Sequence, residues 1–267
     1  MLARLRIVRD RVLDGGRIGA GDTVLDVGCG DGLIALGALE RGAGRVIFSD
    51  VSQDLLDVSR QLAADDPRAE FMLAGAEHLV SVGDESVDVV TTRSVLIYVT
   101  EKRRAFGEFF RVLKRGGRLS MFEPINRFTY PEPDGCWLGM EMGELWPLAR
   151  RVRDRYVAMA GDETAMGDFD ERTLLDLAHD VGFDSAEVDF EARIERGRLW
   201  GAHPPPFERL LATAPNPNAP TLEEVLDAAL SRQERERFLG AVRSRYDAGE
   251  MVGRFAVAYL RARKGLR

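Results

Sequence analysis

The sequence predicts an α/β fold built on a doubly wound, mostly parallel sheet of seven strands. Short apolar runs, typical of buried strands, alternate with segments of helical spacing between residues 22 and 123. The first run, 24–27, leads into glycines at every second position (Gly28, Gly30 and Gly32) and then into a segment rich in Leu and Ala. Strand, tight turn and helix in this order are the repeating unit of such a sheet.

The first half of the chain is expected to supply five strands and four helices. We expect strands at 22–27, 45–50, 70–73, 86–92 and 118–123, and helices at 2–14, 32–41, 52–64 and 101–114. Ser52 is a good N-cap for the third helix, and the fourth should end at Arg115-Gly116-Gly117. Ligands of parallel sheets bind outside the carboxyl ends of the strands, so the loops after these strands are where a site is expected.

The alternation stops after Glu123, resumes at Asp170 and stops again after residue 194. The second half should supply a helix at 170–181, a strand near 185–194 and a last strand at 254–261. The alternating pattern of that last strand favours the edge of the sheet. We therefore expect a single domain over 1–267, with a core at about 15–123, 168–194 and 251–264.

Two insertions, 124–167 and 195–250, follow strands five and six and are expected to form a helical lid. Pro147 suits the start of a helix in the first insertion. In the second, Thr221 with Glu224 and Ser231 with Glu234 have the spacing of capping boxes and predict two further helices.

Composition is that of a soluble globular protein, with 45% hydrophobic and 30% charged residues. The net charge of −7 argues against nucleic acid as the main partner. Two cysteines, Cys29 and Cys136, make no disulfide framework and favour a reducing, cytoplasmic setting. These cysteines and the three histidines lack zinc spacing, so no metal is expected, and no apolar stretch is long enough to span a membrane. The oligomeric state is not predicted.

Acidic residues at the ends of the first two strands limit the classes of ligand that the turn can bind. Asp50, about 20 residues after the turn, is placed to accept from both hydroxyls of a ribose. A nicotinamide dinucleotide pattern would have its third glycine at position 33, which is Leu33. Asp26 beneath the turn would repel a diphosphate and suit a ligand with an ammonium end. Taken singly, either acid could instead serve as a turn or helix cap.

The stretch VLDVGCGDG at 24–32 resembles the first motif of class I S-adenosylmethionine-dependent methyltransferases. Four further stretches match the same family in order: SD at 49–50, AGAEHL at 74–79, SVDVVTTRSVLIYV at 86–99 and VLKRGGRL at 112–119. The resemblance covers 15–123 well, 168–194 loosely and the rest hardly at all. It implies a Rossmann-like fold and S-adenosyl-L-methionine as the cofactor.

The resemblance also implies a set of cofactor-binding residues, which lie in the turn and at the strand ends: Asp26, Gly28, Cys29, Gly30, Asp50, Val51, Ala76, Glu77 and Arg93. By this resemblance Asp26 helps to hold the ammonium, Asp50 binds the ribose and Arg93 contacts the methionine end. Many relatives have an acid at the position of Gly75, so adenine recognition is expected to depend on backbone groups or on Glu77.

Methyl transfer asks the protein to align the acceptor, exclude water and, where the acceptor requires it, remove a proton. The candidate catalytic residues are Tyr98, Glu123 and His203. Tyr98 could instead pack in the fold, and Glu123 could cap a turn. Trp137 and Met140 are expected to line the substrate pocket, in a stretch that could equally be the core of the lid.

The resemblance therefore implies a methyltransferase that acts on an O, N or C nucleophile of a small molecule or peptide-like metabolite, and the resemblance of the overall layout implies a role in bacterial natural-product biosynthesis. One alternative is a peptide N- or C-terminal methyltransferase. The alternatives of another class are a nicotinamide-dependent oxidoreductase and a cofactor-binding scaffold protein without catalytic activity.

Overall fold

The structure, a computed structural model, describes residues 2–160, 166–199, 203–214 and 219–266. The chain forms two compact units. The first, here called the sheet unit, comprises Met1–Ile125, Asp168–Glu191 and Val257–Arg267. The second, here called the helical unit, comprises Asn126–Gly167 and Ala192–Ala256.

A seven-stranded sheet with the order β3-β2-β1-β4-β5-β9-β8 confirms the predicted fold class. Its strands are β1 (Thr23–Val27), β2 (Arg45–Asp50), β3 (Ala69–Leu73), β4 (Val87–Arg93), β5 (Leu113–Pro124), β8 (Ser185–Arg196) and β9 (Val252–Arg263). The first five pair in parallel, and β9 pairs antiparallel with β5. In β1 the apolar side chains Val24, Leu25 and Val27 are buried, which explains its continuous apolar run.

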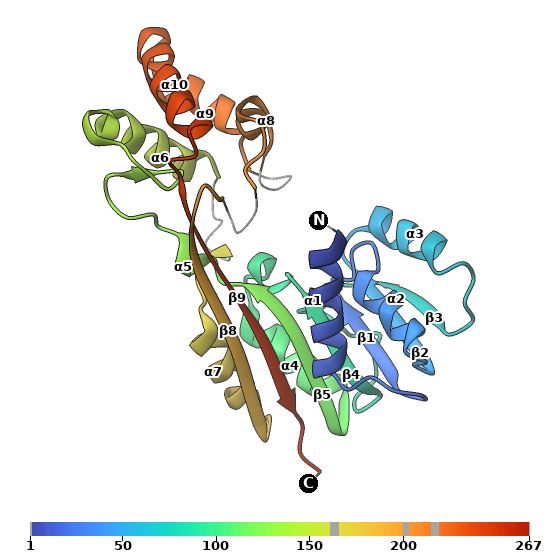
Figure 1. Cartoon of the computed structure of the whole chain (residues 1–267). Helices are drawn as coiled ribbons and strands as arrows, with labels where there is room; N and C mark the ends of the chain where they lie inside the picture. Colours follow the sequence, from blue (N-terminus) through green and yellow to red (C-terminus); the bar gives the residue numbers. More distant parts are fainter. Residues whose placement is uncertain (1, 161–165, 200–202, 215–218, 267) are drawn as a thin grey trace. The chain divides into compact units, whose positions relative to one another are not determined.

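Helices cover both faces of this sheet. They are α1 (Leu2–Gly15), α2 (Leu33–Glu40), α3 (Gln53–Leu62), α4 (Lys102–Val112) and α7 (Glu171–Val181). Figure 1 shows α1 and α2 on one face and α4 and α7 on the other. Ser52 caps α3 as predicted, and Asp170 and Thr173 form a capping box at the start of α7.

Two details of the sheet differ from the prediction. The predicted helix 101–114 ends at Val112, and the Arg115-Gly116-Gly117 segment lies inside β5. There the Gly116 N–H donates to the carbonyls of Lys264 and Gly265, so pairing with the end of the chain replaces the helix end. The last strand, β9, was also predicted wrongly as an edge: it lies between β5 and β8, and β8 forms the edge.

The helical unit has its own apolar core. The elements of this unit are α5 (Asn126–Thr129), the hairpin of β6 (Cys136–Trp137) and β7 (Met140–Glu141), α6 (Trp146–Ala160), α8 (Phe207–Ala212), α9 (Leu222–Ala229) and α10 (Arg232–Asp247). The predicted capping boxes are present at the starts of α9 and α10. The hairpin and α8 were not predicted, because two-residue strands and a six-residue helix leave little periodicity to detect.

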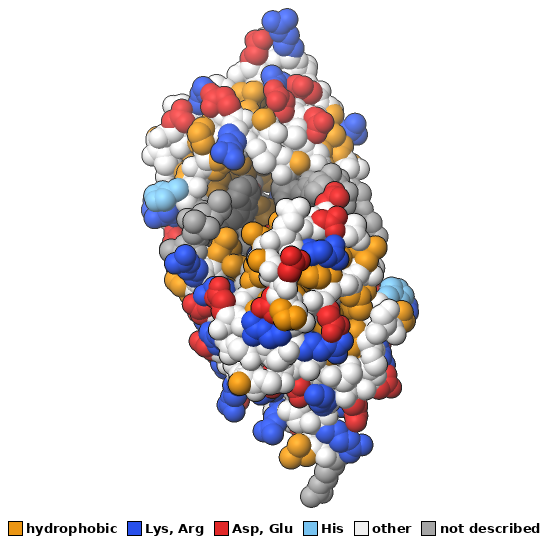
Figure 2. All heavy atoms as spheres, turned by 90° about the vertical axis from the view of Figure 1, so that its right-hand side faces the viewer, with side chains coloured by type: hydrophobic (Ala, Val, Ile, Leu, Met, Phe, Trp, Pro, Cys, Tyr) orange, Lys and Arg blue, Asp and Glu red, His pale blue; other side chains and the backbone are white. Residues whose placement is uncertain are grey.

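The surface mixes charges of both signs. Figure 2 shows Lys and Arg side chains interspersed with Asp and Glu on the face in view. Over the described residues, no helix is both long and apolar enough to cross a bilayer. Within the same residues, no group of three or more His, Cys, Asp or Glu side chains is placed to hold a metal ion.

Candidate functional site

The glycine turn after β1 is held in the left-handed conformation. Gly28, Gly30 and Gly32 have φ of 66°, 57° and 84°, values that glycine adopts without a steric penalty. A Cβ atom at Gly28 would overlap Cγ2 of Val95, whereas a Cβ at Gly30 would meet nothing within 4 Å. The backbone at Gly30 is therefore open to the close approach of a ligand, and the backbone at Gly28 is packed.

Asp50 ties the end of β2 to this turn. Its Oδ2 accepts a 2.8 Å hydrogen bond from the Gly30 N–H, and its Oδ1 accepts one of 2.9 Å from the Ser52 N–H. The side chain is 7% exposed. Each carboxylate oxygen can accept a second hydrogen bond, so both remain able to bind hydroxyl groups.

Asp26 lies beneath the turn and is fully buried. Its Oδ2 accepts from the Ala35 N–H at 3.1 Å and its Oδ1 from the Thr91 hydroxyl at 2.8 Å. Ala35 is in the first turn of α2, whose N-cap, Gly32, has no side chain to offer. Asp26 thus serves the helix start, which is the cap role considered from the sequence. Its predicted contact with an ammonium group stays a prediction.

Burial raises the pKa of Asp26 to about 7, against the hydrogen bond from Thr91 and the charge of Arg93, which lower it. Arg93 ends β4 and is half-buried. Among the described residues it has no hydrogen-bond or ion-pair partner. An arginine without such a partner at the carboxyl end of the sheet can hold a carboxylate, as the predicted contact with a methionine end requires.

Cys29 is buried inside the turn, and its N–H donates to the Ser49 carbonyl at 2.9 Å. Burial raises the pKa of its thiol, so the nucleophilic thiolate is disfavoured. Ser59 donates a 2.7 Å hydrogen bond to the Gly30 carbonyl. The Cys29 carbonyl in turn accepts a 2.9 Å hydrogen bond from the Gly32 N–H, so both backbone groups of Cys29 hold the shape of the turn.

The predicted adenine and ribose residues lie on loops after β2 and β3. Val51 is 76% exposed, and a Cβ at Gly75 would lie 3.2 Å from its Cγ1, so the two loops are neighbours. Ala76 is buried. Glu77 accepts a 2.8 Å hydrogen bond from the Glu101 N–H through Oε1, so this acid is already engaged in holding the start of α4.

The candidate catalytic residues have different surroundings. Tyr98 is 61% exposed, at the end of the 3₁₀ turn Leu96–Tyr98. Glu123 is fully buried, and its Oε1 accepts from the N–H groups of Val95 and Leu96. Its carboxyl has no exposed surface with which to contact a substrate. His203 is exposed in the helical unit.

Trp137 and Met140 pair in the hairpin of the helical unit, and both are buried. Trp137 packs edge-on against Phe238, with ring centroids 5.1 Å apart. Val152 belongs to the same cluster. These positions agree with the lid-core interpretation of the stretch and leave the two residues no surface to offer a substrate.

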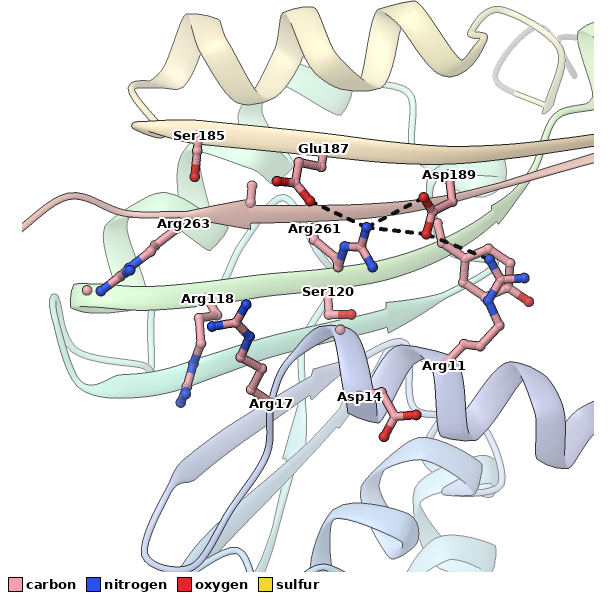
Figure 3. Close-up of a pocket in the computed structure, with 14 residues that line it drawn as sticks. Arg11, Asp14, Arg17, Arg118, Ser120, Ser185, Glu187, Asp189, Arg261 and Arg263 are labelled. Carbon is pink, nitrogen blue, oxygen red and sulfur yellow. Dashed lines mark hydrogen bonds and ion pairs between the residues drawn. The ribbon is translucent and has the colours of Figure 1, made fainter.

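A groove of the sheet unit lies away from the glycine turn. It has a volume of about 600 Å³ and is lined by α1, β5, β8 and β9 (Figure 3). Arg118 of β5 is one of its lining residues, and its pairing with Val89 places it toward the end of the sheet opposite Gly28. Arg261 crosses the groove to form ion pairs with Glu187 and Asp189, at 3.4 and 3.3 Å. These paired charges do not mark it as a cofactor site.

Sequence reasoning missed two residues that shape the turn, Thr91 and Val95. Thr91 is a buried polar residue of β4, and a threonine in a buried strand is a detectable signal for a buried hydrogen-bond partner. Val95 carries no such signal, because its role depends on the approach of its loop to Gly28.

Comparisons with known proteins identify methyltransferases among the relatives of this chain. Residues 25–121 match the family model for a methyltransferase domain. The chain is similar to an arsenite methyltransferase of Halobacterium salinarum, with 37% identity over 131 residues, which are 45% of this chain and 33% of that protein. It is also similar to a demethylmenaquinone methyltransferase of Clavibacter sepedonicus, with 38% identity over 138 residues, which are 52% of this chain and 49% of that protein. The chain thus spans about half or less of the length of these relatives.

Among solved structures, the fold is similar to that of a phosphoethanolamine N-methyltransferase from Haemonchus contortus in complex with S-adenosyl-L-methionine. The TM-score is 0.55 at 17% identity, over 97% of this chain and 52% of that chain. At this identity the likeness shows the fold alone.

Proposed function

We propose that this chain, which belongs to the class I S-adenosylmethionine-dependent methyltransferases, transfers a methyl group from that cofactor to a small molecule. The family match over residues 25–121 confirms the resemblance that the sequence motifs indicated. The observation that carries the proposal is the glycine turn: Gly30 is open to a ligand and is hydrogen-bonded to an acid at the end of the next strand.

The residues at the strand ends fit the parts of the cofactor. Asp50 offers acceptors for the ribose hydroxyls, the open backbone at Gly30 allows close contact, and Arg93 offers a cation for the carboxylate. When bound, the cofactor supplies a methyl group on a sulfonium, which needs no activation by the protein. The chain's own residues then have to orient the acceptor and, for a hydroxyl or carbon acceptor, take up a proton.

Tyr98 is the candidate for that contact, because its side chain is exposed at the end of the turn after β4. Its hydroxyl can orient an acceptor by a hydrogen bond. Glu123 is excluded from direct contact by its burial. His203 remains a second candidate.

The acceptor class that we propose is a small metabolite of bacterial natural-product biosynthesis. By their names, the two relatives act on arsenite and on demethylmenaquinone, which are both small molecules. A peptide terminus is the alternative acceptor. A scaffold that binds the cofactor without catalysis is the alternative of another class.

Binding measurements by calorimetry test which cofactor the protein binds. We expect S-adenosylhomocysteine to bind the wild-type protein and NAD not to bind. Binding of NAD alone would overturn the proposal in favour of an oxidoreductase.

Incubation with isotope-labelled S-adenosylmethionine and a metabolite extract tests the transfer. Mass spectrometry should find label in a small molecule. Label in peptides would support the alternative acceptor, and cofactor binding without any transfer would support the scaffold. Tyr98→Phe should then lower kcat while leaving the affinity for S-adenosylhomocysteine unchanged.

A further inference from the structure

Glu123 joins two segments of the sheet unit that are distant in the sequence. It lies near the end of β5, opposite Ala258 of β9, and is fully buried. Its Oε1 accepts hydrogen bonds from the N–H groups of Val95 at 2.9 Å and Leu96 at 3.1 Å. One carboxylate oxygen therefore holds the start of the turn that follows β4.

That turn reaches the glycine turn. Ser94, directly before it, has a left-handed φ of 57° and donates its N–H to the Phe122 carbonyl at 2.8 Å. Val95 comes next, and its Cγ2 occupies the space that a Cβ at Gly28 would need. A continuous path of contacts thus runs from Glu123 through the Val95 backbone and side chain to Gly28.

The length of the Glu123 side chain, rather than its negative charge, explains why a glutamate stands at this position. N–H groups at the start of a helical turn have no acceptor within the turn, so an oxygen from elsewhere has to satisfy them. The second oxygen, Oε2, is buried and has no hydrogen-bond partner among the described atoms. Lys102, the cation whose field reaches Glu123, is itself hydrogen-bonded to the Val99 carbonyl and paired with Asp168. Burying a carboxyl oxygen without a hydrogen-bond partner costs free energy. We therefore expect the hydrogen bonds that Oε1 accepts to offset the cost of burying Oε2.

We propose that Glu123 is a positioning residue: it holds the N–H groups of Val95 and Leu96, and the Val95 side chain then supports Gly28 in the turn that receives the cofactor. The inference rests on the proposed function, since it takes the glycine turn to be the cofactor site.

Two conservative variants separate reach from charge. Glu123→Gln keeps the reach and an acceptor oxygen but removes the charge, whereas Glu123→Asp keeps the charge and withdraws the oxygens by one methylene. We expect Glu123→Asp to weaken S-adenosylhomocysteine binding about tenfold, because its oxygens no longer reach the two N–H groups, and Glu123→Gln to stay within about threefold of the wild type. Calorimetry on protein shown to be folded by circular dichroism measures both. The reverse order would overturn the proposal, because it would make the charge decisive.

Glu132 offers a matched control in the helical unit. It is half-buried, and its Oε1 accepts a 2.9 Å hydrogen bond from the Gly139 N–H. Glu132→Asp and Glu132→Gln make the same chemical changes in a unit that does not contain the glycine turn, and neither should alter the affinity for S-adenosylhomocysteine. A tenfold loss in Glu132→Asp as well would mean that the effect is general destabilisation.

A double-mutant cycle tests the path through Val95. If Glu123 acts through this side chain, the losses in Glu123→Asp and Val95→Ala should not multiply in the double variant. Multiplying losses would contradict the path. Failure of the wild-type protein to bind S-adenosylhomocysteine would reject the proposed function itself, and that result is distinct from any difference among the variants.

Discussion

The Gly30 N–H donates a 2.8 Å hydrogen bond to Asp50 Oδ2, and this bond joins the glycine turn after β1 to the end of β2. The other oxygen accepts from the N–H of Ser52, the N-cap of α3. One carboxylate therefore fixes a turn, a strand end and a helix start. Removing it should disturb both the predicted ribose contact and the turn itself.

Asp50→Ala tests this double role. We expect the affinity for S-adenosylhomocysteine to fall by about tenfold or more, because hydrogen bonds to charged groups contribute about 1.5–3 kcal/mol each. Calorimetry measures the change. Asp57→Ala is the matched control, since Asp57 is an exposed acid on α3 that pairs with Arg60. An unchanged affinity in Asp50→Ala would remove Asp50 from the site.

Alanine substitution at two glycines should separate stability from binding. Both Gly28 and Gly30 have positive φ, so alanine costs about 1 kcal/mol at either position. At Gly28 the new methyl also meets Val95, whereas at Gly30 it projects into open space. We expect Gly28→Ala to lower the melting temperature more, and Gly30→Ala to weaken cofactor binding with a smaller loss of stability. Val95→Ala should restore part of the stability of Gly28→Ala, and failure to do so would contradict the packing.

Stability should fall as the pH rises from 4.5 to about 7. Burial raises the pKa of Asp26 from 3.8 and that of Glu123 from 4.5, each to about 7. The folded protein thus retains protons that the unfolded chain releases in this window, and each group costs about 1.4 kcal/mol per pH unit there. The contribution of each carboxyl group to the free energy of unfolding is fully present below its pKa in the unfolded chain and is lost above its pKa in the folded protein. The positive charges of Arg93 near Asp26 and of Lys102 near Glu123 lower these two pKa values, but burial outweighs them.

Urea unfolding at about pH 5 and about pH 8 measures this loss. Glu123→Gln removes one of the two titrating groups, so its stability should change less between these pH values than that of the wild type. An equal change in both proteins would show that Glu123 does not titrate in this window.

Local signals in the sequence predicted the sheet unit well. Alternating apolar runs and helices placed β1 to β4 within about two residues, because both patterns depend on neighbours in the chain. Ser52, Thr221 and Ser231 were predicted as caps for the same reason: the side chain bonds to an N–H three residues away.

Features that depend on distant contacts were not predictable. The interior place of β9 is set by its partners β5 and β8, although its alternating residues suggested an edge. The contact of Glu123 with Val95 spans 28 residues and has no local signature. Sequence reasoning had no means of choosing between Glu123 as a candidate catalytic residue and Glu123 as a turn cap, and its burial in the structure favours a role within the fold.

Trp137→Ala distinguishes a structural tryptophan from a substrate contact. Trp137 is buried against Phe238 in the core of the helical unit. Its removal should cost about 3–5 kcal/mol of stability, because the cavity cannot close fully. Val157→Ala, at an exposed position of α6, is the control and should have little effect. Thermal unfolding measures stability, and calorimetry with S-adenosylhomocysteine should show unchanged affinity, since the predicted cofactor residues belong to the sheet unit. If the variant had normal stability and a raised KM for the acceptor, the result would instead support Trp137 as a residue of the substrate pocket.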